Sequence, residues 1–136
     1  MALTGRLHPL LVHFPIALVL IAAIAELVSV TTRFPGWHTV AVANVRAGAA
    51  SAVAAAGAGW LLASSRIVEA SPALEWHRWL GVTAAITAAL TIGEMDDRPS
   101  RQWRYRVALF SAAALVAVAG HFGAVLVWGA DFLRPQ

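Results

Sequence analysis

The stretch VALFSAAALVAVAGHFGAVLVWGA, residues 107–130, contains no Asp, Glu, Lys or Arg and decides the class of this fold. The hydrocarbon core of a bilayer is about 30 Å thick, and about 20 helical residues cross it. Three further apolar runs precede this one in the chain. The third of the four runs has an uncharged centre of only residues 79–92, so it reaches membrane length if its flanking polar side chains extend to the bilayer surface. The runs are continuous rather than alternating and rich in Ala and Leu, which favours helices over strands. We therefore predict an all-α integral membrane protein with four transmembrane helices, at about residues 10–30, 39–65, 76–95 and 106–130.

The composition supports a location in the membrane. Of the 136 residues, 60% are hydrophobic and 12% are charged, whereas a soluble domain has about 25% charged residues. These values exclude a soluble enzyme domain and a disordered chain. The absence of cysteine excludes a disulfide scaffold, a thiolate metal site and covalently attached c-type haem. The net charge of +3 does not indicate nucleic-acid binding, because all ten basic residues are Arg and are spread between the apolar runs.

Short connections, at residues 31–38, 66–75 and 96–104, join the runs. Such connections join antiparallel neighbours, so residues 1–136 should form one up-down-up-down four-helix bundle. Both termini and the middle connection then share one side, face A, with Arg6, Arg66, Arg78 and Arg134. The opposite side, face B, has Arg33, Arg98, Arg101, Arg104 and Arg106, which by the positive-inside rule favours face B as cytoplasmic. Tryptophans lie near the span ends, as an aromatic belt requires: Trp60, Trp76, Trp79, Trp103 and Trp128.

Small residues recur along the second run, at Gly48, Ala52, Ala56 and Gly59. Small residues at four-residue spacing let helix backbones approach closely in a membrane. The same feature would also leave room for a flat macrocycle beside the helix. Close packing is the commoner reason for such a pattern.

Histidines are the most informative polar residues. His8, His13, His77 and His121 fall in the half of the bundle nearest face A, and His38 lies at face B. Histidine within a span is costly and usually faces the bundle interior, so this cluster is a candidate functional site. Neutral imidazoles from facing helices suit a low-spin haem b. We expect His13 and His121 as axial ligands because both lie inside the bilayer, with His77 and His8 as alternative or second ligands.

Two other interpretations of the histidines remain open. Three or four imidazoles could bind copper or zinc instead of haem iron. Alternatively, each histidine is an interfacial residue hydrogen-bonded to a carbonyl group. Methionine is scarce, with only Met1 and Met95, which argues against a copper(I) transport path.

Two charged residues lie within the spans. Glu26 and Arg46 are at similar depths from face B, on the first and second runs. An unpaired charge in lipid is expensive, so we predict that they form a structural ion pair. A proton-carrying or quinone-headgroup role is the alternative.

The chain resembles a family of four-span membrane proteins, the domain-of-unknown-function 2231 family, in three motifs. They are LHPLLVHFPIAL at residues 7–18, WHRWLG at residues 76–81 and GHFGAVLVWGAD at residues 120–131. Ala124 stands where the closing motif usually has a second glycine, a small-for-small difference. The resemblance covers nearly the whole chain and implies the four-span fold and the polar positions His8, His13, His77 and His121. Related domains are joined to periplasmic c-type cytochrome modules, which implies a redox setting with face A outside.

The sequence therefore predicts a membrane-embedded b-type haem electron-transfer protein, or the haem-bearing membrane subunit of a redox or respiratory complex. It would lie in a bacterial inner membrane with both termini periplasmic, in contact with lipid and with a periplasmic redox partner or other subunits. The alternatives are a non-redox structural anchor subunit, without a cofactor, and a copper- or zinc-binding membrane protein. No soluble domain is present to hold a substrate, so we do not expect an enzyme acting by itself.

Overall fold

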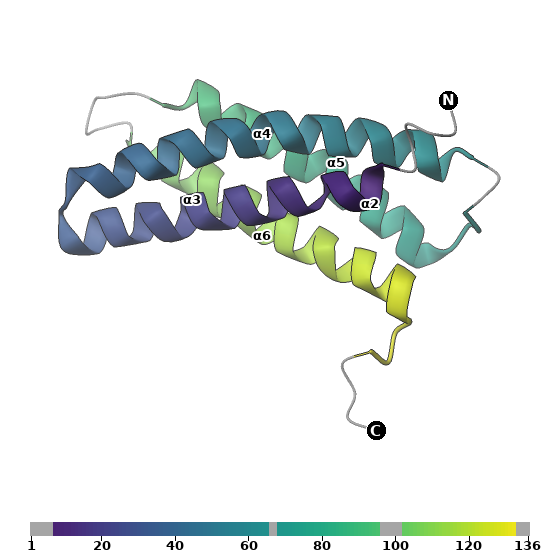
Figure 1. The fold of residues 1–136 in the computed structure, drawn as a ribbon. Coiled ribbons are helices and arrows are strands. Elements are labelled where there is room, and N and C mark those ends of the chain that lie inside the picture. Colours follow the sequence, from purple (N-terminus) through teal and green to yellow (C-terminus); the bar gives the residue numbers. More distant parts are fainter. Residues whose placement is uncertain (1–6, 66–67, 96–101, 133–136) are drawn as a thin grey trace.

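The fold is all-helical in a computed structural model, which describes residues 7–65, 68–95 and 102–132. The described helices are a one-turn helix followed by four long ones (Figure 1): α2 His8–Leu11, α3 His13–Thr32, α4 Pro35–Ala63, α5 Pro72–Gly93 and α6 Gln102–Trp128. The prediction of an all-α bundle is confirmed. The helices of the second and fourth apolar runs begin before the predicted spans, α4 at Pro35 and α6 at Gln102.

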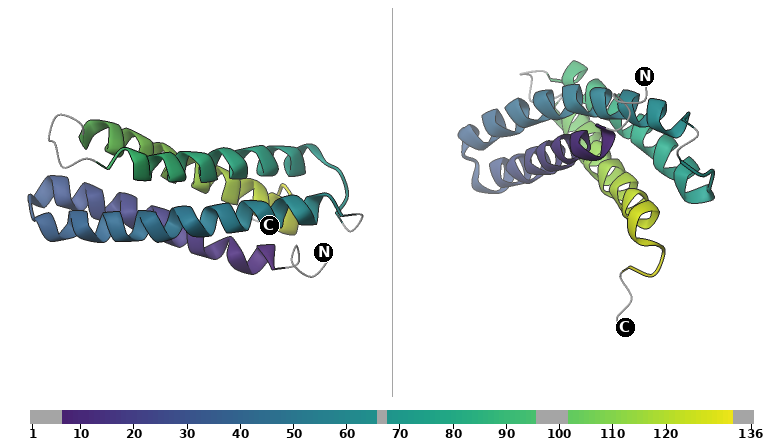
Figure 2. Two further views of the ribbon diagram at one scale, coloured as in Figure 1. Left: turned by 90° about the horizontal axis from the view of Figure 1, so that it is seen from above. Right: turned by 45° about the vertical axis from the view of Figure 1, so that its right-hand side comes forward.

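The four long helices run alternately up and down. α3 and α4 form one antiparallel hairpin, α5 and α6 form a second, and the hairpins pack through α4 against α5 and α3 against α6 (Figures 1 and 2). α2, the end of α4, the start of α5 and the end of α6 lie at face A. Towards face A, α6 diverges from the hairpin of α3 and α4 (Figure 2).

A break between α2 and α3 sets the position of the first histidine. Val12 separates the two helices, and its backbone N–H still donates to the carbonyl of His8. Pro15 has no backbone N–H, so the carbonyl of Leu11 has no helical partner four residues on. The chain therefore enters the bundle as a separate turn that carries His8.

The core consists mainly of alanine. Twelve buried residues from all four long helices form one cluster: Val19, Ala22, Ala23, Val45, Ala49, Ala84, Ala88, Tyr105, Leu109, Ala112, Ala113 and Val116. At Gly48 a methyl group would lie 2.9 Å from Cγ2 of Val19, so α3 and α4 approach closely there. This confirms the expectation of close packing along the small-residue helix.

Large apolar side chains cover the outside of the bundle, as lipid contact requires. Three helical segments are long and apolar enough to cross a membrane: residues 8–32, 36–63 and 102–128. α5 falls short of that criterion because His77, Arg78 and two tryptophans occupy its first turns. The structure thus supports a multi-pass membrane protein in which three of the four long helices are candidate spans.

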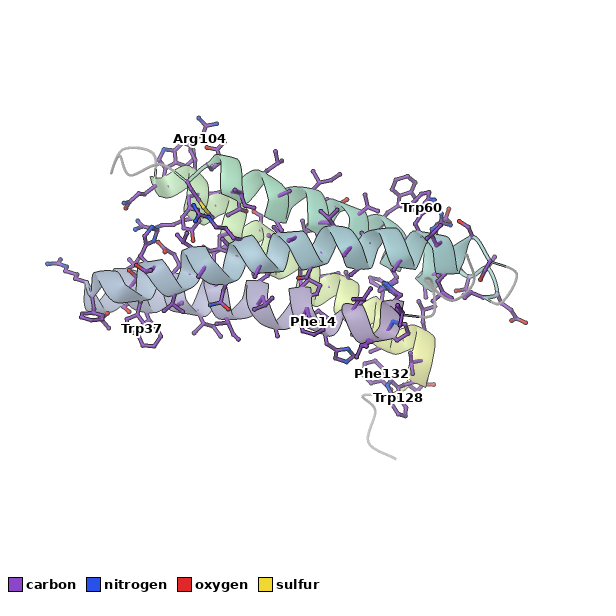
Figure 3. All side chains as sticks on the ribbon, turned by 45° about the horizontal axis from the view of Figure 1, so that its top comes forward. Phe14, Trp37, Trp60, Arg104, Trp128 and Phe132 are labelled. Carbon is purple, nitrogen blue, oxygen red and sulfur yellow. The ribbon has the colours of Figure 1, made fainter. Side chains whose placement is uncertain are left out.

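Exposed tryptophans mark both ends of the bundle. Figure 3 shows Trp37 at face B and Trp60 and Trp128 at face A. Five of the arginines used to orient the chain lie outside the described residues: Arg6, Arg66, Arg98, Arg101 and Arg134. The orientation in the membrane therefore stays a prediction.

Candidate functional site

His8 and His77 face each other between the two hairpins. His8 lies on α2 and His77 in the second turn of α5, and their Nε2 atoms are 3.5 Å apart. Both side chains are half-buried. No third ligand-type side chain joins them in a cluster within the described part of the chain.

Backbone carbonyl groups fix both imidazoles through the other ring nitrogen. Nδ1 of His8 lies 2.8 Å from the carbonyl oxygen of Ala55, and Nδ1 of His77 lies 2.8 Å from that of Ala119. A carbonyl oxygen can only accept, so each Nδ1 carries a hydrogen and donates it. In the neutral imidazole this leaves Nε2 with a bare lone pair, and the two lone pairs face each other.

The two rings meet head to head. Their centroids are 5.8 Å apart with an interplanar angle of 73°. The centroid separation minus the Nε2–Nε2 distance (5.8 Å minus 3.5 Å) equals two ring radii of about 1.2 Å each, given ring bonds of ordinary length. Both Nε2 atoms therefore lie close to the line between the ring centres, and the lone pairs point along one axis.

A glycine one helical turn beyond each carbonyl makes room for each ring. A methyl group at Gly59 would lie 2.7 Å from Cε1 of His8, and one at Gly123 would lie 3.1 Å from Cε1 of His77. Residues four apart share one face of a helix, so Ala55 and Gly59 form one platform for an imidazole. Residues 119 and 123 form the equivalent platform on α6. Each hairpin thus contributes a histidine held on an Ala-x-x-x-Gly platform, and the two halves meet at the Nε2 atoms.

Aromatic contacts hold α4 and α5 together beside this pair. The guanidinium of Arg78 lies 4.2 Å from the ring centroid of Trp60. Trp60 also makes an edge contact with Trp79, at a centroid distance of 5.8 Å. Cation–π and edge-to-face contacts of this kind stabilise partly buried helix pairs.

Comparison with known families gives one match. The family described as predicted membrane protein (DUF2231) matches residues 5–132, nearly the whole chain. The chain belongs to this family. No curated protein and no solved structure matched significantly.

The three motifs of the sequence analysis converge on the site. The opening motif supplies His8, the second supplies His77 and the closing motif supplies Gly123, which follows the accepting carbonyl of Ala119 by one turn. Motifs that are far apart in the sequence thus meet at one pair of imidazoles.

The other two histidines of the motifs lie elsewhere. His13 and His121 are both exposed, and His121 packs against Phe122 and Phe132 with centroid distances of 5.8 Å to each. Of the four histidines expected at face A, the structure brings together His8 and His77, the second-choice pair of the sequence analysis. The sequence signal that could have identified this pair is Gly59 and Gly123. Each glycine lies four residues after the alanine whose carbonyl accepts from the imidazole.

Glu26 pairs with partners other than Arg46. It is fully buried; its Oε2 lies 2.6 Å from Nδ1 of His38, and its Oε1 accepts from Nε of Arg106 at 2.8 Å. Arg46 is exposed, so the predicted Glu26–Arg46 ion pair differs from the observed one. Helical spacing explains the difference, because His38 and buried Val45 share a face of α4 from which Arg46 is turned by about 100°.

Tyr105 completes this second cluster. Its ring is buried and makes an edge contact with His38, at a centroid distance of 5.5 Å. Among the described residues its hydroxyl has no hydrogen-bond partner. The cluster lies at face B, so the bundle has polar groups at both ends and an alanine core between them.

Proposed function

We propose that this membrane protein is a b-type haem electron-transfer protein, or the haem-bearing subunit of a larger redox assembly, in which His8 and His77 would hold the haem iron. The observation that carries the proposal is the head-to-head arrangement of the two Nε2 atoms, 3.5 Å apart on a common axis. When bound, haem b supplies one-electron redox chemistry.

The donor set fits a bis-imidazole site. Axial ligation needs two neutral imidazoles that present bare nitrogens from opposite sides, each oriented by a hydrogen bond from its other nitrogen. His8 and His77 meet both conditions through Ala55 and Ala119. His8 and His77 would hold the iron through their Nε2 atoms, and each imidazole would keep its hydrogen bond to the carbonyl of Ala55 or Ala119.

The proposed location and partners rest on the sequence prediction that face A is periplasmic. The pair lies near face A, which we place on the periplasmic side of a bacterial inner membrane together with both termini. A periplasmic redox partner would then reach the site over a short distance. Two histidine ligands would leave the iron without an open coordination position, so we expect electron transfer rather than catalysis by the chain itself.

One observation favours a second candidate, a non-redox anchor subunit. Each imidazole hydrogen-bonds to a carbonyl of a different helix, which ties α2 to α4 and α5 to α6. Such bonds are useful in a membrane even without a cofactor. A structural zinc site is less well supported, because zinc usually takes four protein ligands.

A reduced-minus-oxidised absorption spectrum of the detergent-purified chain, with a pyridine haemochrome assay, tests the proposal. Haem with a sharp alpha band is expected in the wild type and in the His13→Ala and His121→Ala controls. The band should be lost in His8→Ala and His77→Ala. A colourless wild-type chain from haem-sufficient cells would overturn the proposal. Bound copper or zinc, measured on the same sample, would indicate the metal-ion alternative, and absence of both would favour the anchor.

A further inference from the structure

A cavity at face B is lined by polar and basic side chains. Its volume is about 240 Å³, and its lining residues are Ser29, Arg33, His38, Gln102 and Arg106. We propose that this cavity binds the phosphate group of an anionic phospholipid. The inference is independent of the haem proposal, since the histidine pair lies at the opposite end of the bundle.

The charges around the cavity favour an anion. Arg33 and Arg106 contribute two cations, and the one acidic side chain at the cluster, Glu26, is buried with both oxygens engaged by His38 and Arg106. Arg106 uses Nε for Glu26 and one Nη2 contact for Gln102, at 3.2 Å, which leaves further N–H donors. Neighbouring Arg104 is paired with Glu94 at 2.9 Å, so that pair adds little net charge. Among the described residues the cavity therefore has an excess of positive charge.

Arg33 occupies a backbone position that suits glycine better. Its φ of 56° ends α3 in the left-handed conformation, which side chains other than those of Gly and Asn rarely adopt. Arg33 makes no ion pair within the described part of the chain. Arg33 thus has a strained backbone, lines the cavity and has no ion-pair partner among the described residues, so its guanidinium is positioned to bind an external anion.

The ends of the helices add donors to this charge. α4 and α6 both begin at face B, with His38 and Gln102 in their first turns. Helix N-termini favour anions through their free N–H groups and dipole. These groups supplement the arginines.

The cavity lies where a lipid headgroup would be. Exposed Trp37 and Trp103 lie within one residue of His38 and Gln102 and mark the interfacial level. Basic pockets between transmembrane helices at this level are typical sites for lipid phosphate groups. Exposed apolar side chains on the same helices, Val30 on α3 and Val107 on α6, provide a surface for acyl chains that a free phosphate would not use.

The test compares lipids and two matched arginine variants of the full chain in neutral detergent. Thermal unfolding and native mass spectrometry are measured with added phosphatidylglycerol, phosphatidylcholine or inorganic phosphate. The test variant is Arg33→Gln, which removes a cation that lines the cavity. The control is Arg46→Gln, which removes an exposed arginine outside the cavity. Phosphatidylglycerol should stabilise the wild type and the control more than phosphatidylcholine does. Arg33→Gln should bind it about fivefold more weakly.

Ser29→Leu provides a second test that changes no charge. The larger side chain fills part of the cavity from α3 and should also weaken phosphatidylglycerol binding, so the proposal stays testable if Arg33→Gln fails to fold. Equal binding of both phospholipids, or equal behaviour of the lining and control variants, would overturn the proposal. Stabilisation by inorganic phosphate that equals the lipid effect and depends on Arg33 would assign the cavity to free phosphate and overturn the lipid assignment.

Discussion

Gly59 leaves the space that the ring of His8 occupies: a methyl group there would lie 2.7 Å from Cε1 and 2.9 Å from Nδ1. Gly59→Ala should therefore displace the imidazole and break its hydrogen bond to Ala55. We expect a loss of about 1–3 kcal/mol in the free energy of unfolding, typical of overpacking. Thermal or chemical unfolding in detergent would measure it.

Gly57→Ala is the matched control for this substitution. Gly57 lies on the same helix with nothing within 4 Å of an added methyl group. Ala forms helices better than Gly, so the control should gain roughly 0.5–1 kcal/mol. Equal destabilisation by the two variants would mean that Gly59 does not provide the space for the ring of His8.

Gly123→Ala should have a smaller effect of the same sign. Its methyl group would lie 3.1 Å from Cε1 of His77, which a shift of a few tenths of an ångström relieves. We expect a loss of about 1 kcal/mol in unfolding free energy. At Gly120, the control, the nearest atom is Cδ1 of Ile16 at 3.7 Å, an ordinary contact. A larger loss from Gly120→Ala than from Gly123→Ala would contradict the structure.

The long helices were predictable because continuous apolar runs of membrane length leave few alternatives to helix. The rotation of each helix about its axis was not. In a membrane the core-facing and lipid-facing sides are both apolar, so no amphipathic pattern tells which side of α3 carries the buried Glu26 or which side of α4 carries the exposed Arg46. For the same reason, depth in the bilayer alone led to the prediction of His13 and His121 as ligands. The histidines that face each other are instead His8 and His77.

Tyr105→Phe should stabilise the protein. The hydroxyl of Tyr105 is buried and has no hydrogen-bond partner among the described residues, a state that costs free energy. Removal of the hydroxyl keeps the ring in contact with His38 and should raise the free energy of unfolding by about 1 kcal/mol. Unfolding curves of the two proteins in the same detergent would measure this. A destabilised Tyr105→Phe variant would instead mean that the hydroxyl is hydrogen-bonded in the membrane-embedded protein, for example to water.

Glu26→Gln and Glu94→Gln form a matched pair, because each removes a carboxylate that accepts from Nε of an arginine. Glu26 is fully buried and joins α3 to both α4 and α6, whereas the Glu94–Arg104 pair is largely exposed. Removal of the Glu26 charge leaves the guanidinium of Arg106 without its counter-charge, although Arg106 and His38 are partly exposed to solvent. We expect a loss of about 2–3 kcal/mol for Glu26→Gln and less than about 1 kcal/mol for Glu94→Gln.

Equilibrium unfolding in low and high salt separates the two glutamates further. Salt screens exposed pairs more than buried ones, so added salt should shrink the effect of Glu94→Gln and leave most of the effect of Glu26→Gln. Arg46→Gln belongs in the same series. If Glu26 paired with Arg46 instead of Arg106, this variant would destabilise as strongly as Glu26→Gln; with Arg46 exposed, its effect should stay within about 0.5 kcal/mol of zero.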